Sequence, residues 1–596
     1  MAGGPVVGGL NKRYNGRSTF YIYFVVILGA CAGLLLGYDN GVIGGVTAMA
    51  DFQLKFFEDT LYAHNHPAEY LAMNPGQGVE AAQQAQLADQ EAASPYCKYD
   101  DQILQLVVSS LYLAAAATSV FAAHWARKFG RKPMLFISGV LFCVGAGLQG
   151  GAVDVGMLVA GRVVLGLGVG IASLVGPVYN AEMAPAHLRG AMNVLFQLAV
   201  TIGILAAGLI NYGCEHLHPW GWRLSLALAA VPGALIALGG IVLPDSPVSY
   251  IERGHMEKAH KVLVRIRGVD NVDEEFQDII EAARLSSQIK HPWRNLFKSQ
   301  YRPQLIISLL FMLFQQFTGI NAIIFYAPIL FSSIGSSDTT SLINTVIIGA
   351  VNVLATLVAV FLVDRLGRKF LLIQGGVQMI IAEIVVGVTL KKEFEKASSS
   401  RLANIAAGLV SADSPLVVPD AVAIGVLVVI CVFIAGFAWS WGPIGWLYPT
   451  EIQPLETRTA GASINTASNM IFTFVIGQSF VTMLCSMEWG VFLFFAGFVI
   501  TMTLWTIFLL PETKGKDLEN TFRTFQTHPF WSKFSRVNDI HHNELPRISE
   551  EGANPKQADA PMAEEMPNPK VINQAFLLML TKLSKAISAW VSLGQA

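Results

Sequence analysis

ARKFGRKPMLFISGV (Ala126–Val140) and VDRLGRKFLLIQGGV (Val363–Val377) are two copies of one motif. In each copy, a Gly-Arg-Lys triplet separates two apolar runs. Two further landmarks repeat in the same order: Glu182, Pro185 and Arg189 have the spacing of Glu451, Pro454 and Arg458, and LPDSP at Leu243 matches LPETK at Leu510. Three landmarks in one order, each at the end of an apolar run, indicate a duplicated unit.

Each copy of the unit contains six apolar runs of about 20 residues, the length that crosses a bilayer. The runs lie near residues 20–48, 102–123, 134–153, 157–180, 190–213, 223–243, 303–333, 341–363, 370–390, 421–447, 457–485 and 489–510. The composition agrees, because only 14% of the residues are charged, against about 25% in soluble proteins. The sequence therefore predicts an all-α membrane protein with twelve transmembrane helices in two six-helix halves.

The basic residues of the short loops predict the orientation, since such loops stay in the cytoplasm. The two Gly-Arg-Lys loops are basic, so both termini are expected inside. We expect a cytoplasmic N-terminus (1–19), a first half (20–246) with an external loop or lid (51–100), cytoplasmic linker helices (247–300), a second half (301–511) and a partly disordered cytoplasmic tail (512–596). An amphipathic helix is expected over 571–593; Lys582 and Lys585 favour an interfacial position over a thirteenth span. Lys391, Lys392, Lys396 and Arg401 oppose this orientation, because they would be external.

Charge and cysteine content exclude several classes of partner. The net charge of -2 gives no reason to expect a nucleic acid, and six scattered cysteines are too few for a metal site or a disulfide scaffold. We therefore expect no metal and no cofactor, and the lipid bilayer as the main surroundings of the chain.

Taken together, these motifs resemble the major facilitator superfamily, and specifically its sugar porter branch. QQFTGINAIIFYAP from Gln315 belongs to the same resemblance. GYDNG at Gly37, SPYCKYD at Ser94, FAWSWGPIGW at Phe437 and FVTMLCSMEWGVFLFFAG at Phe480 are similar to plant and green-algal monosaccharide/proton symporters. The resemblance implies a major facilitator fold and a proton-coupled importer of a monosaccharide such as glucose, which works by alternating access in the plasma membrane and is not an enzyme. A facilitative uniporter and a transport-derived sugar sensor are the alternatives.

A charge in the first apolar run is the candidate for proton coupling. Asp39 lies among glycines in the outer half of this run, where a carboxylate costs about 3 kcal/mol in hydrocarbon. Arg162 lies in the outer half of the fourth run. A carboxylate binds protons more tightly when buried and less tightly beside a cation, so we predict that Asp39 carries the proton and Arg162 tunes it. A fixed ion pair that locks two helices is the alternative. The resemblance favours symport, because facilitative carriers of the family typically lack this acid.

Neutral polar side chains within the runs are the candidates for sugar binding, since a hexose has hydroxyls and no charge. Alternatively, such amides only hold helices together. The resemblance places seven side chains at sugar-contacting positions: Gln197, Gln315, Gln316, Asn321, Asn352, Trp446 and Asn469. Thr473 is a weaker addition, and Gly442 and Ile204 are expected to line the site. The glycine of QQFTGIN is expected to break its helix, and GPIG is expected to be flexible.

The remaining predictions concern the ends of the runs. Ion pairs between the halves are expected to gate the inner side, from Arg131, Glu182, Arg189, Asp364, Arg368, Glu451 and Arg458; a role in topology alone is the alternative. The resemblance implies a disulfide between Cys97 and Cys485, with two free thiols as the alternative. Glu383, the other acid within a run, is expected to make an interhelical or snorkelling contact without a role in transport.

Overall fold

A computed structural model describes residues 19–58, 97, 99–185, 189–289, 291–333, 338–406, 419–454, 456–514, 524–525 and 527–535. Within these residues the regular structure is entirely helical. Most of the predicted external loop, the disordered part of the tail and the predicted helix over 571–593 lie outside the described residues.

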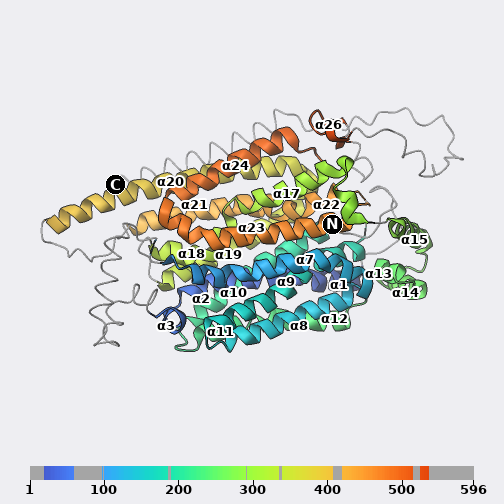
Figure 1. The fold of residues 1–596 in the computed structure, drawn as a ribbon, viewed down its shortest axis with the longest axis horizontal. Helices are drawn as coiled ribbons and strands as arrows, with labels where there is room; N and C mark the ends of the chain where they lie inside the picture. The colour runs from blue at the N-terminus through green and yellow to red at the C-terminus, as the bar shows by residue number, and fades with distance from the viewer. Residues whose placement is uncertain are drawn as a thin grey trace.

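The described chain contains 12 helices that are long and apolar enough to cross a membrane, as predicted. Those of the N-terminal half are α1–α2 (Phe20–Ala30, Ala32–Ala48), α7 (Gln102–Phe129), α8 (Arg131–Gly150), α9 (Val155–Met183), α10 (Arg189–Cys214) and α11–α12 (Gly221–Ala227, Ala230–Val242). Those of the C-terminal half are α17–α18 (Arg302–Gln316, Ile320–Ser333), α19 (Asp338–Leu366), α20 (Arg368–Ala406), α21–α22 (Asp420–Ala438, Trp441–Glu451), α23 (Arg458–Met487) and α24 (Gly490–Leu509). The helices run side by side in one bundle (Figure 1).

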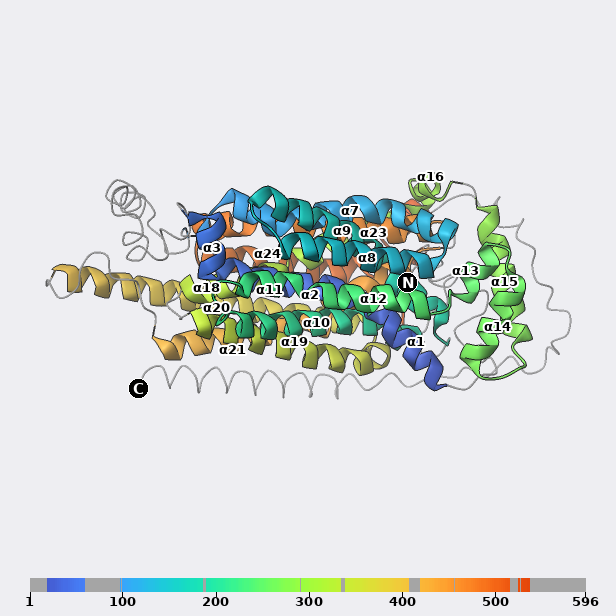
Figure 2. The same cartoon turned by 90° about the horizontal axis from the view of Figure 1, so that it is seen from below.

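Short helices mark the two ends of the bundle. The linker helices α13 (Pro247–Glu252), α14 (Met256–Arg267) and α15 (Asp273–Gln288) lie at one end, which we call the linker end (Figures 1 and 2). Helix α3 (Ala50–Phe56) lies at the opposite end, together with the projecting end of α20. The remaining short helices are α16 (Pro292–Leu296), η4 (Ser299–Tyr301) and α26 (Ser532–Ser535).

Helix α14 buries one apolar face. Ala259, Leu263 and Ile266 are buried. Arg267 forms an ion pair with Glu275 of α15, with 2.6 Å between Nη2 and Oε1, and donates from Nη1 to the carbonyl of Met183 at 3.0 Å. These bonds fix the linker helices to the end of α9.

Two spans of the C-terminal half are interrupted near the predicted sites. Helix α17 ends at Gln316 and α18 begins at Ile320, with Gly319 at φ +77° between them. This conformation favours glycine, and a Cβ at Gly319 would also lie 2.8 Å from the Phe495 ring. The predicted break in QQFTGIN is therefore confirmed. The tenth span is interrupted before GPIG and not within it. The chain leaves the helix at Trp439 and Ser440, whereas GPIG, which was expected to be flexible, lies in the regular start of α22.

A ridge of glycines lets α2 approach α10 closely. Gly33, Gly37, Gly41 and Gly45 are spaced four residues apart and all face α10. A Cβ at Gly41 would lie 2.8 Å from the carbonyl oxygen of Ile204, too close for a real side chain. This close packing fixes the position of α2, which carries Asp39.

The two halves meet mainly where α7 packs against α23, α10 against α19, and α2 against α18. Helix α20 differs from its prediction, because it continues past residue 390 to Ala406 and includes the basic residues of this segment. A helical continuation allows these charges to project beyond the apolar part of the span.

Candidate functional site

Asp39 and Arg162 form an ion pair in the interior of the N-terminal half, with exposures of 1% and 0%. Arg162 donates from Nη1 to Asp39 Oδ1. It also donates from Nε to the carbonyl of Val107 at 2.8 Å and from Nη2 to that of Val108 at 3.3 Å. The other carboxylate oxygen, Asp39 Oδ2, has no hydrogen-bond partner among the described residues. The predicted pair is thus brought together, and one oxygen can accept a proton.

Close packing of α7 against α9 explains why backbone carbonyls reach the guanidinium. Gly166 and Gly170 of α9 lie against the backbone at Leu111 and Ala115 of α7. A Cβ at Gly170 would lie 3.0 Å from the Cα of Ala115. The absence of side chains here lets α7 pass close enough to Arg162 to satisfy two of its donors.

In the C-terminal half, Gln315 is the centre of a buried amide network. Its Nε2 donates to the carbonyls of Trp441 at 2.8 Å and Gly442 at 3.2 Å, both in α22. Its Oε1 accepts from Asn469 Nδ2 of α23 at 2.7 Å. Three helices therefore meet at one neutral side chain, and the carbonyl of Gly442, a predicted lining residue, belongs to the network.

The second part of the network crosses the break between α17 and α18. Asn321 donates to Gln316 Oε1 at 2.5 Å and to Thr473 Oγ1 at 3.5 Å. Thr473 donates in turn to the carbonyl of Asn469 at 2.8 Å. The break places amides on both sides of it within reach of α23, as expected for a site that recognises hydroxyl groups.

The other predicted site residues lie on neighbouring helices. Within the described part of the chain, no hydrogen bond joins the side chains of Gln197 of α10 and Asn352 of α19 to the network. Ile204 is buried against the glycine ridge. Trp446 is half-buried and packs edge-on against Phe196 of α10, with 6.0 Å between ring centroids. Trp446 thus contacts the N-terminal half from α22.

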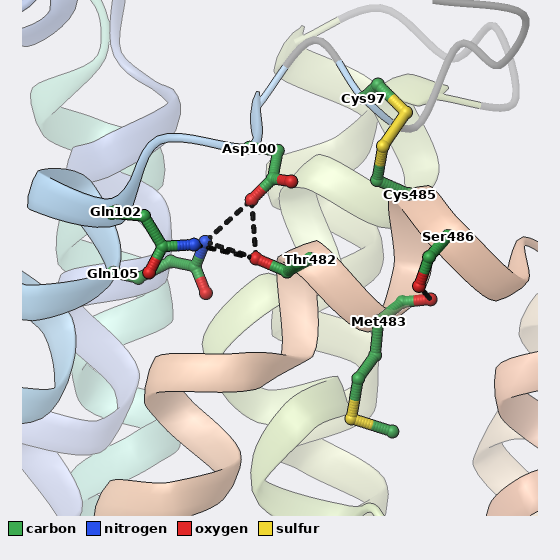
Figure 3. The surroundings of a disulfide bond; sticks show 8 residues. All are labelled: Cys97, Asp100, Gln102, Gln105, Thr482, Met483, Cys485 and Ser486. Atoms are coloured by element: carbon green, nitrogen blue, oxygen red, sulfur yellow. Dashed lines mark hydrogen bonds between the residues drawn. A yellow bond between two sulfur atoms is a disulfide. The ribbon is translucent and has the colours of Figure 1, made fainter.

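A disulfide joins the halves beside the start of α7 (Figure 3). The other end of α7 precedes Arg131, which pairs with Glu252 of linker helix α13, so the bond lies at the end of the bundle opposite the linker. Cys97, in the segment before α7, is bonded to Cys485 of α23, with 4.5 Å between their Cα atoms. The predicted bond is present in the structure. We call this end the disulfide end.

Hydrogen bonds beside the disulfide also join the halves (Figure 3). Asp100 Oδ1 accepts from Thr482 Oγ1 of α23 at 2.7 Å and from Gln105 Nε2 of α7 at 2.9 Å. Ser109 of α7 donates to Gln478 Oε1 of α23 at 2.7 Å. These contacts close the disulfide end between α7 and α23.

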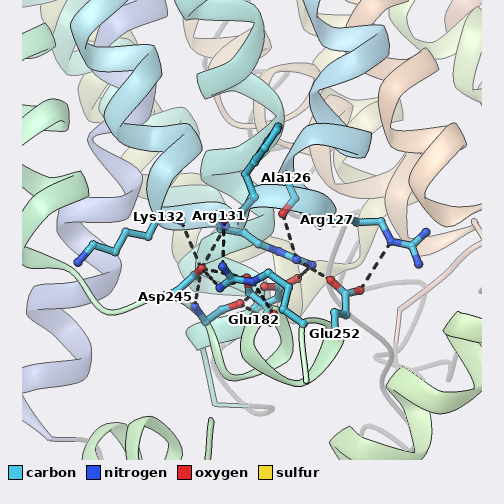
Figure 4. Close-up of polar contacts among 11 residues, drawn as sticks. Ala126, Arg127, Arg131, Lys132, Glu182, Asp245 and Glu252 are labelled. Atoms are coloured by element: carbon cyan, nitrogen blue, oxygen red, sulfur yellow. Dashed lines mark hydrogen bonds and ion pairs between the residues drawn. The ribbon is translucent and has the colours of Figure 1, made fainter. Parts of the chain in front are cut away.

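At the linker end of the N-terminal half, Arg131 is the centre of an ion-pair network (Figure 4). Its guanidinium lies 2.8 Å from Glu182 of α9 and 2.6 Å from Glu252 of α13. Asp245 Oδ1 accepts from the backbone N–H of Arg131 at 3.1 Å and of Lys132 at 3.3 Å. This network fixes the start of α8 to α9 and to the linker.

The C-terminal half has a corresponding network. Arg368 lies 2.9 Å from Glu451 and 3.0 Å from Asp364. Glu512 accepts from the backbone N–H of Arg368 at 3.2 Å and of Lys369 at 2.9 Å. In both halves an arginine thus pairs with a glutamate, and a second acid accepts from two backbone N–H groups.

These ion pairs differ from the predicted gating pairs, because Glu182 and Glu451 are each bound to an arginine of their own half. In this conformation each of the two glutamates already has a short ion pair within its own half. Arg458 is buried at the start of α23, whereas the side chain of Arg189 lies outside the described part of the structure. A pairing between the halves in another conformation stays a prediction.

Residues 25–525 match the model of the sugar (and other) transporter family. The chain belongs to this family. Among curated members, it is 48% identical to Sugar transport protein MST3 of Oryza sativa subsp. japonica, covering 91% of this chain and 98% of the relative. It is 47% identical to H(+)/hexose cotransporter 1 of Parachlorella kessleri, covering 89% and 94%.

Solved structures of the xylose transporter XylE from E. coli have the same fold as this sugar transporter family member. A partially occluded inward open form matches with a TM-score of 0.63 at 24% identity and covers 84% of this chain and 100% of XylE. The form bound to 6-bromo-6-deoxy-D-glucose matches with a TM-score of 0.65. The chain is a multi-pass membrane protein with the major facilitator fold.

Two groups of contacts in this sugar transporter family member were not predicted from the sequence. Asn40 accepts a hydrogen bond from Tyr112 at 2.7 Å, both in the interior of the bundle. The signal for Asn40 was available, because it is a second polar residue directly after Asp39. Asp245 lies in LPDSP, a motif seen as a landmark, but its bonds to backbone N–H groups depend on tertiary structure.

Glu383 is buried in α20, as expected for an acid within a span. Its Oε2 has no hydrogen-bond partner in the described part of the chain. The predicted interhelical contact is therefore absent for this oxygen among the described residues, and burial within the helix bundle agrees poorly with snorkelling. Its proposed lack of a role in transport stays a prediction.

Proposed function

We propose that this protein imports a monosaccharide, a hexose such as glucose, together with a proton. The observation that carries the proposal is the buried pair of Asp39 and Arg162, in which one carboxylate oxygen has no hydrogen-bond partner among the described residues. A carboxylate in this position can gain and lose a proton as the arginine approaches or leaves. The names of the algal relatives, which are H(+)/hexose cotransporters, support the same reaction.

The two sites have separate tasks in this mechanism. Asp39 takes up a proton while it faces the outside, and the amides around Gln315 and Asn321 bind the sugar hydroxyls. The halves then rock, which exposes both ligands on the other side. One charge moving through 100 mV contributes about 2.3 kcal/mol, and one pH unit contributes about 1.4 kcal/mol. Their sum corresponds to roughly 500-fold accumulation of sugar.

The proposed orientation places the linker end in the cytoplasm and the disulfide end outside. The first Gly-Arg-Lys loop lies at the linker end, where Arg131 pairs with Glu252 of α13. The second precedes α20, whose other end projects from the opposite end of the bundle (Figures 1 and 2). Both basic loops therefore lie at the linker end, in agreement with the positive-inside rule. A disulfide persists in an oxidising compartment, so Cys97 and Cys485 fit the external face of the plasma membrane. Both termini are then cytoplasmic.

Uptake into proteoliposomes tests this function. Wild-type protein should concentrate radiolabelled glucose when an inward acid gradient is imposed, and a protonophore should abolish the accumulation. Asp39→Asn should bring the final ratio of inside to outside sugar to about one, because the side chain no longer titrates, while sugar exchange at equal concentrations continues. Glu383→Gln is the matched control, since it neutralises the other buried acid of a span and should still accumulate sugar.

Two outcomes contradict the proposal. If wild-type protein equilibrates glucose but never concentrates it, the protein is a uniporter and the ion pair is structural. If Asp39→Asn concentrates sugar as well as wild type does, another group carries the proton.

A further inference from the structure

The proton site and the amide network lie in different halves, so a symporter needs a contact that relates them. The structure has such a contact around Tyr112 of α7. This residue is fully buried and donates from its hydroxyl to Asn40 Oδ1 at 2.7 Å. Asn40 directly follows Asp39 in α2, so movement of Asn40 also displaces the carboxylate.

Helix α7 holds both partners of the proton site. Its carbonyls at Val107 and Val108 bind Arg162, and its Tyr112 binds the residue next to Asp39. These groups lie within two turns of one another on α7. A shift of Tyr112 relative to α2 therefore changes how closely the carboxylate and the guanidinium approach.

The ring of Tyr112 faces the C-terminal half. It stacks on Phe325 of α18, with 5.5 Å between ring centroids and 25° between ring planes. The carbonyl of Phe325 packs against Gly44 of α2, where a Cβ would lie 2.9 Å from the carbonyl carbon. Phe325 therefore contacts the helix of Asp39 directly through its backbone and indirectly through Tyr112.

Phe325 is also tied to the amide network. It lies four residues after Asn321, which is one helical turn. The helix is interrupted at Gly319 before this turn and has non-helical backbone angles at Tyr326 after it, with φ -120° and ψ 15°. The turn from Asn321 to Phe325 is thus bounded by two irregular positions, and it can shift without the rest of α17 and α18.

We propose that Tyr112 is the positioning residue that couples the sugar-dependent position of α18 to the proton affinity of Asp39. The inference rests on the function proposed above. When the amides of Asn321 and its neighbours bind sugar, the turn that carries Phe325 shifts, the stacked ring of Tyr112 follows, and the bond to Asn40 moves α2 relative to Arg162. The Tyr112 hydroxyl and the Phe325 ring are both needed for this transmission.

The test compares three variants in proteoliposomes with an imposed acid gradient. Tyr112→Phe removes the bond to Asn40 and keeps the stacked ring, whereas Phe325→Leu removes the stacking and keeps an apolar side chain. Tyr38→Phe is the matched control, because Tyr38 is also buried and precedes Asp39, but its hydroxyl donates to the Ser225 carbonyl within the N-terminal half, at 2.8 Å. Each variant is assayed for accumulation and for proton-independent exchange of glucose.

Tyr112→Phe and Phe325→Leu should each lower the accumulation ratio by about five-fold or more, the factor that corresponds to one hydrogen bond or one aromatic pair. Their exchange rates and thermal stabilities should stay close to those of Tyr38→Phe. Wild-type accumulation by Tyr112→Phe overturns the inference. Equal loss of accumulation, exchange and stability also overturns it, since the role is then structural. If wild-type protein itself fails to concentrate sugar, the proposed function fails rather than this coupling.

Discussion

The linker ends of the two halves are nearly the same, whereas their interiors differ. In both halves an arginine binds a glutamate, a second acid accepts from two backbone N–H groups, and a buried tyrosine donates to a proline carbonyl. The corresponding pairs are Arg131–Glu182 and Arg368–Glu451, Asp245 and Glu512, and Tyr179–Pro244 and Tyr448–Pro511. Both copies of the duplicated unit have therefore kept one way of fixing their helix ends.

The interiors have diverged in charge. Arg162 lies twenty residues before the glutamate of its half, and the residue at the same distance before Glu451 is Cys431. The N-terminal half holds a buried ion pair, and the C-terminal half holds neutral amides. A site for a proton needs a charge that can be neutralised, whereas a site for a sugar needs uncharged donors and acceptors. The difference between the interiors thus agrees with a proton site in the N-terminal half and a sugar site in the C-terminal half.

The largest effect is expected from the removal of Arg162, because it abolishes the buried ion pair of the N-terminal half. Arg162→Met leaves Asp39 without its cation, and an uncompensated buried charge costs about 3–5 kcal/mol. We expect Asp39 to stay protonated and accumulation of sugar to be lost. Cys431→Met is the matched control and should accumulate normally. Accumulation assays in proteoliposomes check both variants, and normal accumulation by Arg162→Met would show that the pair has no role in coupling.

The amide network offers the converse test in the C-terminal half. Gln315→Ala removes three hydrogen bonds, each worth about 0.5–1.5 kcal/mol. We expect the KM for sugar to rise by a factor of about ten or more, while the response to the acid gradient is kept. Gln304→Ala, in the same helix, is the control. An unchanged KM for Gln315→Ala would place the sugar elsewhere.

Glu182→Gln and Glu451→Gln test how similar the ion pairs at the linker ends of the two halves are. The Glu182 side chain is 0% exposed and that of Glu451 is 17% exposed. We expect losses of about 2 kcal/mol and about 1 kcal/mol, since buried charged hydrogen bonds are worth more than partly hydrated ones. Thermal unfolding in detergent measures both losses. A larger loss for Glu451→Gln would show that burial does not set the strength of these two ion pairs.

A histidine at the disulfide end of the N-terminal half makes a small pH-dependent contact. His218 Nδ1 lies 2.7 Å from Asp51 of α3, and this hydrogen bond raises the pKa of His218. Because the folded pKa is raised, the stabilisation is complete below the unfolded pKa of about 6.5 and is lost as the pH rises through the folded pKa.

We expect His218→Gln to be less stable than wild type at about pH 5 and equal to it at about pH 9, with a difference of roughly 0.5 kcal/mol or less because the pair is exposed. Unfolding curves at the two pH values measure it. A difference that is the same at both values would show that the histidine acts through packing.

Much of this arrangement was predictable from the sequence, because membrane burial makes each polar residue informative. Asp39, Arg162 and Gln315 stand out in apolar runs, and all three make buried contacts. The aromatic contact of Tyr112 was not predictable, since an aromatic residue in an apolar run has no distinguishing pattern. The partner of Glu182 was also missed, because its distance to arginines of either half depends on how the helices pack.

The single covalent bond between Cys97 and Cys485 has a consequence for motion. Two bodies joined at one point of their rim cannot separate equally around the whole rim. When the disulfide end opens, either the segment before α7 must travel with α23, or the widest separation must occur on the far side, between α10 and α19. The bond therefore gives the rocking movement a preferred axis, and solutes should enter through an asymmetric mouth.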